Sequence, residues 1–386
     1  MTTFLHSFGI SRARLAAMVV KEFIQMRRDR LTFALLIGIP IMQLALFGFA
    51  INNDPKGLPT IVHVAEDGPH ARSILSALRN SGYFKLEEEA ASRAQVDRAL
   101  ELGRVQFAVT IPAGFERTLL RGETPQLLIE ADASDPSATG NAIAALARIG
   151  TEALRHDQGD LAGTTVATDD RPPPFEFVVH RRFNPDGITQ YNIVPGLIGV
   201  ILTMTMVITT AMAMTRERER GTMENLLAMP VRPIEVMTGK ILPPIGMGAI
   251  QVSVVLIAAR GLFGVPMTGS FPALIIAVML FIATNLCIGF TFSTVARNQL
   301  QAMQMSFFFF LPSILLSGFM FPFRGMPSWA QAIGECLPLT HFLRVVRGVM
   351  LRGNGFAEVS ANAWPMLAIL VVVTVVALNR YRQTLD

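Results

Sequence analysis

The sequence predicts an α-helical polytopic membrane protein with six transmembrane helices and an external α/β domain inserted between spans one and two. Long uncharged apolar runs recur along the 386 residues, of which 51% are hydrophobic and only 16% are charged. A soluble domain carries roughly a quarter charged residues, so a purely soluble enzyme is excluded. Residues 54–186 are different, because they hold 14 basic and 20 acidic residues, as an ordinary soluble domain does.

Residues 1–30 are predicted to form a cytoplasmic amphipathic helix that lies along the inner face of the membrane. Its apolar face carries Leu15, Met18, Val19, Phe23 and Met26, and its polar face carries Lys21, Gln25 and Arg28. The helix either anchors the chain through its basic charge or binds a partner, and the sequence leaves both roles open.

Residues 31–51 form the first predicted transmembrane helix, because they carry no charge and are long enough to cross a hydrocarbon core. A cleaved signal peptide is the competing interpretation. It is disfavoured because the run is longer than a signal core of roughly 7 to 15 residues, and Gly48-Phe49-Ala50 is a poor cleavage site.

Residues 187–386 are predicted to form a transmembrane domain with five further helices. Crossing the membrane takes roughly 20 apolar residues in a helix, and uncharged runs of about that length recur here. Glycines and prolines between 264 and 272 predict a turn within the longest run. The spans are expected at 188–214, 241–259, 273–295, 302–323 and 359–379, with short external helices at 324–358.

The orientation follows from the basic residues that flank the spans. Fourteen Lys and Arg fall on one side of the membrane and five on the other, leaving out the α/β domain. Cytoplasmic loops carry the excess of basic residues, so both termini are expected in the cytoplasm and residues 52–186 outside. The basic excess therefore reflects topology, and no nucleic-acid partner is expected.

The α/β domain is expected to have strands at 60–64, 83–86, 105–109 and 126–129, with a further strand at 175–179. Helices are expected at 69–80, 92–102, 113–121 and 136–157. The histidines are scattered without metal-ligand spacing, so neither a catalytic nor a metal site is predicted.

The segment 215–230 after the second span is predicted to be a short cytoplasmic helix with a narrow apolar stripe and many charges. Such a helix suits docking into a cleft of a cytoplasmic protein, but its charges could equally serve only to set the topology. The candidate contact residues are Arg216, Arg218, Glu219, Arg220, Gly221, Thr222, Glu224, Leu227 and Pro230.

This segment closely resembles the signature of type 2 ABC transporter permeases, from Glu219-Arg220-Gly221 through Pro230 to Gly239-Lys240. Further resemblance lies at Phe183-Asn184-Pro185, Val194-Pro195-Gly196 and Leu316 to Pro322. The resemblance implies that 215–230 is the coupling helix that contacts an ABC ATPase subunit. It also implies a bacterial inner-membrane location and a second permease copy, as a homodimer or a related heterodimer. The large domain between spans one and two resembles the drug-efflux branch, which also allows a periplasmic adaptor protein as a partner.

The chain is expected to have no ATPase site of its own and to bind no cofactor, because no GxxxxGK[ST] phosphate loop occurs. ATP and Mg would then be used by the partner ATPase. Secondary transport is the rival, but it usually needs ionisable residues within the membrane, and the middles of the six predicted spans contain none.

The translocation path is harder to assign. Thr205 and Thr209 in the second span, with Met303 and Phe307 in the fifth, could form an adaptable surface for amphiphiles. They could equally pack against membrane lipid or a second copy. Four arginines near the outer face could gate substrate or form a ring at headgroup level: Arg324, Arg344, Arg347 and Arg352.

The function predicted from these features is that of the permease subunit of an exporter that moves hydrophobic or amphiphilic compounds, with drugs as the first expectation. The alternative is a membrane-anchored sensing or interaction protein whose external α/β domain is the binding module.

Overall fold

The computed structural model describes residues 54–154, 174–219 and 233–382, together with Ala34, Ile41, Met42 and Leu46. The predicted amphipathic helix at 1–30 lies outside the described residues, and so does the first predicted span at 31–51 apart from those four positions. Most of the predicted coupling helix, residues 220–230, also lies outside them.

The α/β domain contains a five-stranded sheet in the order β2-β1-β3-β4-β5. Only the β3 and β4 pair is antiparallel, and the other neighbouring strands run parallel. The expected strands are confirmed, including the last one, which is longer than predicted. Their bounds are β1 Leu58–Val64, β2 Phe84–Glu89, β3 Phe107–Ile111, β4 Gln126–Asp132 and β5 Glu176–Arg182.

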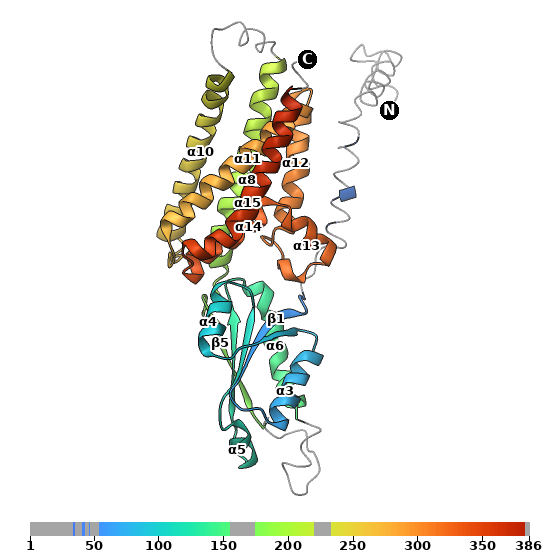
Figure 1. Ribbon diagram of the computed structural model, residues 1–386, viewed down its shortest axis with the longest axis vertical. Coiled ribbons are helices and arrows are strands. Elements are labelled where there is room, and N and C mark those ends of the chain that lie inside the picture. The colour runs from blue at the N-terminus through green and yellow to red at the C-terminus, as the bar shows by residue number, and fades with distance from the viewer. Residues whose placement is uncertain are drawn as a thin grey trace, which may run out of the picture.

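Helices cover both faces of this sheet. Side chains on successive strand residues point to opposite faces, so neighbouring residues of one strand join different hydrophobic cores. Phe107 and Val109 of β3 join a core with α3 and α6, whereas Ala108 joins a second core with α4. The helices are α3 Pro69–Asn80, α4 Arg93–Glu101, α5 Phe115–Leu120 and α6 Pro136–Glu152. In Figure 1 α4 lies near the membrane helices and α5 lies at the far tip of the domain.

The helical part contains five helices, among the described residues, that are long and apolar enough to cross a membrane. They are α8 Thr189–Glu219, α10 Pro233–Gly261, α11 Phe271–Val295, α12 Gln299–Leu316 and α15 Phe356–Arg382. α11 packs against α8 and α15, while α10 and α12 both lie against α8. Figure 1 shows these helices as one bundle with the α/β domain at one end.

Short helices fill the end of the bundle that faces the α/β domain (Figure 1). α14 packs against α8, α11 and α15, and its buried side chains, such as Phe342, join the main membrane core. The elements are η2 Phe323–Gly325, α13 Ser328–Glu335, α14 Pro338–Arg347 and η3 Gly348–Arg352.

Several predicted helix ends are wrong, and one is the start of the third span, because α10 begins at Pro233 instead of residue 241. The fifth span was expected to reach residue 323, but α12 ends at Leu316, because Gly318 takes a left-handed conformation with φ 86°. α15 begins at Phe356 instead of residue 359. The sequence prediction began the span after the charged Glu358, where the uncharged apolar run begins. In the structure the Glu358 carboxylate accepts a hydrogen bond from the Gly355 N–H and thereby caps the first turn of the helix.

A further correction concerns the start of the coupling helix. Residues 215–219 are the last turn of α8 and do not begin a separate helix. No glycine or proline interrupts the sequence between Gly199 and Gly221, so nothing in the backbone ends the helix before the described part stops. The helix that contains the second span therefore continues into the charged segment.

α8 and α11 approach closely at Gly289. A Cβ at this position would lie 2.7 Å from the Val207 carbonyl oxygen and 3.0 Å from the Thr210 Cβ. Small residues allow helix backbones to approach in membranes, where packing replaces the hydrophobic driving force. Gly289 therefore sets the distance between the two helices at this point.

Gly289→Val is expected to lower the apparent melting temperature of the purified protein, because the added side chain meets the α8 backbone. Overpacking typically costs about 1 to 3 kcal/mol. Gly246→Val in α10 is the matched control, since a Cβ there meets nothing within 4 Å. Thermal unfolding in detergent would measure both variants, and equal shifts would contradict this role of Gly289.

Candidate functional site

The charged end of α8 is joined to the start of α12 by Arg216, Glu219 and Gln299, here called the α8–α12 clamp. The Gln299 N–H donates to Glu219 Oε1 at 2.8 Å, and Gln299 Nε2 donates to Glu219 Oε2 at 2.5 Å. Arg216 Nε donates to Gln299 Oε1 at 3.2 Å. The clamp thus uses two residues that were predicted to contact an ATPase subunit.

Local sequence explains the clamp. Asn298 caps α12 by accepting from the Gln301 N–H at 2.8 Å, which leaves the Gln299 N–H free to bind another acceptor. A carboxylate is favoured at a helix N-terminus, where the helix dipole is positive. The Gln299 side chain, followed by the Gln299 backbone, holds the pKa of Glu219 below its usual range.

Of the remaining predicted contact residues, only Arg218 is among the described residues. Arg218 lies in the last turn of α8. The others lie outside the described residues: Arg220, Gly221, Thr222, Glu224, Leu227 and Pro230. The coupling contact therefore stays a prediction for them.

The residues proposed to line a path are not gathered into one cavity. Thr205 Oγ1 lies 2.7 Å from the Ile201 carbonyl oxygen and 2.9 Å from Gln251 Oε1 of α10, so the two acceptors share its single proton and the hydroxyl turns toward α10. Thr209 donates to the Thr205 carbonyl at 2.6 Å. Met303 and Phe307 lie half-buried on α12, which packs on α8. A cavity lies between α10 and α11, and none of these four residues lines it.

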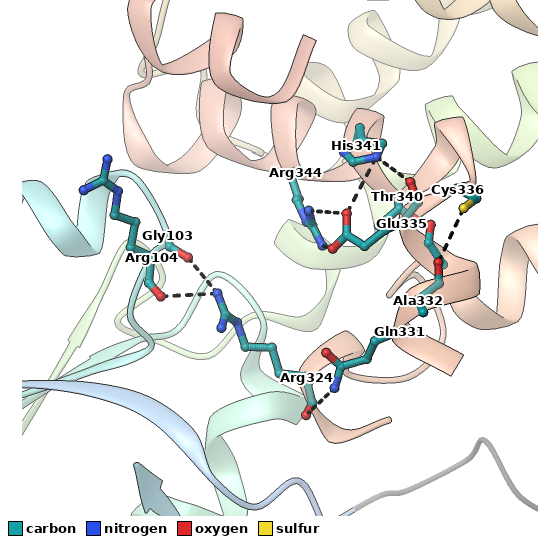
Figure 2. Close-up of polar contacts among 11 residues, drawn as sticks. Gly103, Arg104, Arg324, Gln331, Ala332, Glu335, Cys336, Thr340, His341 and Arg344 are labelled. Carbon is teal, nitrogen blue, oxygen red and sulfur yellow. Dashed lines mark hydrogen bonds and ion pairs between the residues drawn. The ribbon is translucent and has the colours of Figure 1, made fainter. Parts of the chain in front are cut away.

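A polar layer occupies the opposite end of the bundle (Figure 2). Arg344 donates to both oxygens of Glu335, at 3.1 and 2.5 Å, and His341 Nε2 lies 2.9 Å from the Glu335 carbonyl oxygen. Thr340 donates to the Gly334 carbonyl at 2.6 Å. These bonds fix α13 and α14 to each other.

Arg324 reaches from this layer to the α/β domain, as Figure 2 shows. Its Nη2 lies 3.4 Å from the Gly103 carbonyl oxygen and 3.2 Å from the Arg104 carbonyl oxygen. Its own carbonyl accepts from Gln331 Nε2 at 3.4 Å. The side chain thus bridges η2 and the loop that follows α4.

Three further polar contacts tie the α/β domain to the helices, and sequence reasoning missed all of them. Arg352 donates to Asp132 Oδ2 at 2.5 Å and to Ser134 Oγ at 2.9 Å. The others are Arg98 to Glu358 at 2.7 Å, and Asn192 to Asp135 at 3.2 Å. Partners as far apart in the sequence as Arg98 and Glu358 give no local signal, although arginines clustered between spans did mark one side of this junction.

The four outer arginines therefore have different surroundings. Arg324 and Arg352 bind the α/β domain, and Arg344 binds Glu335 within the layer. Arg347 Nη1 donates to the Gly318 carbonyl at 3.0 Å, while its Nε and Nη2 are buried without a partner among the described residues. Two of the four are thus structural links between the two parts of the chain.

The described residues contain no group of three or more His, Cys, Asp or Glu side chains that could hold a metal ion. The features with functional potential are therefore the charged end of α8, the polar junction and the apolar surfaces of the helices.

Comparison with known proteins gives consistent matches. A family model described as ABC-2 family transporter protein matches residues 30–379. The chain is 28% identical over 347 residues to the probable multidrug ABC transporter permease YbhS of Escherichia coli (strain K12), covering 89% of this chain and 90% of that protein. It is 31% identical over 314 residues to the inner membrane transport permease YhhJ of the same organism, covering 78% and 79%. It is also 23% identical to ABC transporter G family member 20 of Dictyostelium discoideum, over 97% of this chain but 51% of that protein.

Gln299→Ala is expected to loosen the end of α8, because Glu219 loses the Nε2 donor of Gln299 and Arg216 loses its Oε1 acceptor, so only the bond from the backbone N–H of residue 299 remains. Amide hydrogen exchange of residues 211–219, followed by mass spectrometry, should become faster. Gln304→Ala, also on α12 but outside the clamp, is the control. Unchanged exchange in the Gln299 variant would refute the link.

Acid should weaken the clamp. Because the folded pKa of Glu219 is lowered, its contribution to stability is complete above the ordinary glutamate pKa of about 4.3 and is lost as pH falls through the lowered value. Exchange at the end of α8, corrected for its intrinsic pH dependence, should rise below that range in the parent protein. The rise should be smaller in Gln299→Ala, which keeps only the backbone donor to Glu219.

Arg352→Ala is expected to destabilise the junction by about 3 to 5 kcal/mol, since it leaves the buried Asp132 carboxylate without its cation. The double variant Arg352→Ala/Asp132→Asn should recover part of this loss, because no unpaired charge remains. Chemical unfolding of the purified protein measures both, with exposed Arg297→Ala as the control. Losses that simply add would contradict a direct pairing.

Proposed function

The chain belongs to the ABC-2 family of transporter proteins, and we propose that it is the permease subunit of an exporter driven by ATP hydrolysis in a separate subunit. It is a transmembrane transport subunit without an ATPase of its own. The observation that carries the proposal is the family match over residues 30–379, which spans the charged segment after α8 as well as the helices.

We propose six spans, with residues 31–51 as the first and residues 52–186 as an external domain. Figure 1 supports this arrangement, since the α/β domain lies at the end of the bundle opposite the last turn of α8 and the end of α15. The charged end of α8, with Arg216 and Arg218, lies opposite the α/β domain, and an excess of basic residues is typical of the cytoplasmic side. Both termini would then be cytoplasmic, in a bacterial inner membrane.

The coupling segment would transmit motion through α8. This helix has 31 residues, which corresponds to about 46 Å at 1.5 Å per residue, and it runs from the junction to the clamp. An ATPase subunit, binding ATP and Mg, would dock on residues 220–230 and move the ends of α8 and α12 together. The clamp supports this proposal because it joins those two ends.

Two copies of the permease would form the path, with Thr205, Thr209, Met303 and Phe307 as candidate lining residues. We propose hydrophobic or amphiphilic compounds, and drugs first, as the substrates. Two observations support this: the name of the YbhS relative includes "multidrug", and the central parts of the described spans lack Asp, Glu, Lys, Arg and His. A periplasmic adaptor protein fits as a further partner.

Glu224→Lys is expected to weaken binding of the ATPase subunit about tenfold or more, the equivalent of one lost charge contact of roughly 1.4 kcal/mol. Export should fall to the level of cells without the permease, while the amount of protein in the membrane stays the same. Co-purification with an ABC ATPase subunit expressed together with the chain, and efflux of a fluorescent lipophilic cation, would measure the two effects.

Glu123→Lys is the matched control, because Glu123 is an exposed glutamate that follows α5 in the sequence, and Figure 1 shows α5 at the tip of the α/β domain far from the charged end of α8. Glu219 is a poorer choice than Glu224, since its replacement also breaks the clamp. Full ATPase binding and full efflux by the Glu224 variant would refute the proposed docking segment.

A further inference from the structure

A cavity of about 710 Å³ opens between α10, the loop that follows it, and α11. Its walls are almost entirely apolar, with Val252, Leu256 and Ile257 on one side and Ile275 and Met279 on the other. We call this feature the α10–α11 crevice. α10 stands at the edge of the bundle, where the crevice can open sideways (Figure 1).

The crevice lies within the part of the bundle that crosses the membrane. Both flanking helices are predicted spans, and α10 leaves apolar side chains such as Ile250, Val254 and Ile257 exposed by 66%, 59% and 72%. In a bilayer such a surface faces acyl chains. A void of this size left empty would forfeit dispersion contacts along its whole lining.

The length of the crevice matches one leaflet. It extends along α10 from Ala249 to Arg260, which is about 16 Å at 1.5 Å per residue. Half of a hydrocarbon core is about 15 Å. The Ser253 hydroxyl donates to the Ala249 carbonyl at 2.8 Å, so it is satisfied within the helix and leaves the inner wall effectively apolar. An extended acyl chain meets these conditions.

Arg260 stands at the outer end of the crevice, in the last turn of α10 and one residue from the end of the span. Its side chain is exposed, and no carboxylate lines the crevice. Arg324, Arg344 and Arg352 at the same end each have protein acceptors, whereas none of the described residues pairs with Arg260. A guanidinium at headgroup level is suited to bind a phosphate through paired hydrogen bonds.

We propose that the α10–α11 crevice is a binding site for an anionic phospholipid of the leaflet on the α/β-domain side. One acyl chain lies between α10 and α11, and the phosphate binds Arg260. The site needs only that these helices cross the membrane, so it does not depend on the proposed export function.

The test uses the full-length protein in mixed micelles that contain equal amounts of phosphatidylglycerol and phosphatidylcholine. Native mass spectrometry measures how much of each lipid stays bound. The parent protein should retain phosphatidylglycerol preferentially, and Arg260→Gln should reduce that retention about tenfold, the effect of losing a contact worth about 1.4 kcal/mol. Arg297→Gln, an exposed arginine at the other end of α11, is the matched control and should have no effect.

A second variant tests the apolar part of the site. Ile275→Trp fills the crevice from a partly exposed position and should reduce retention of both lipids. Inorganic phosphate at millimolar concentration should not displace the lipid, because it cannot occupy the acyl groove. Equal losses for the Arg260 and Arg297 variants, unchanged retention by Ile275→Trp, or displacement by phosphate would overturn the proposal.

Discussion

The structure depends on one constraint, which is that backbone N–H and C=O groups in hydrocarbon must find their partners within the chain. α8 meets this constraint as one continuous helix of 31 residues. Several of its threonine hydroxyls also find acceptors inside the helix, as Thr203 does with the Gly199 carbonyl and Thr215 with the Ala211 carbonyl. A segment that must stay helical across the membrane is also a rigid connection between its two ends.

The position of α8 makes that rigidity useful. α10, α11, α12 and α14 all pack on it, and close approach at Gly289 holds α11 against it. Its first turns are linked to the α/β domain by Asn192 and Asp135, and its last turn is linked to α12 by Glu219 and Gln299. A displacement at either end is therefore carried to the other end and to a second helix. This property suits a transport subunit that is moved by a partner on one side of the membrane.

The two ends of the bundle differ in how they use charge. At the end near the α/β domain, Arg324 and Arg352 are bound to protein acceptors and join two parts of the chain. Arg260, at the same end but beside an apolar crevice, has no such acceptor among the described residues. Arginines that look alike in sequence thus have different physical roles, which depend on whether a carbonyl or carboxylate lies within reach.

The sequence by itself determined the elements whose signals are local. Apolar run length located the five described spans, and strand propensity with turn residues located β1 to β5. The end of α12 and the start of α15 were misplaced, because the left-handed Gly318 and the capped Glu358 act through backbone geometry that hydropathy does not register. Of the candidate functional site, the sequence predicted only that a charged segment follows the second span, and not that this segment binds the start of α12.

Only the tertiary structure decided which side chains meet. Glu219 and Gln299 are 80 positions apart, and Arg352 and Asp132 are 220 apart, so no periodicity links them. Their pairing follows from the order in which helices pack and from the placement of the α/β domain. The crevice between α10 and α11 arises in the same way, because its walls come from helices that each look like ordinary spans. Local sequence specifies a helix or strand because its backbone hydrogen bonds and the burial of its side chains depend mostly on neighbouring residues. A contact between two elements forms only when the whole chain is folded.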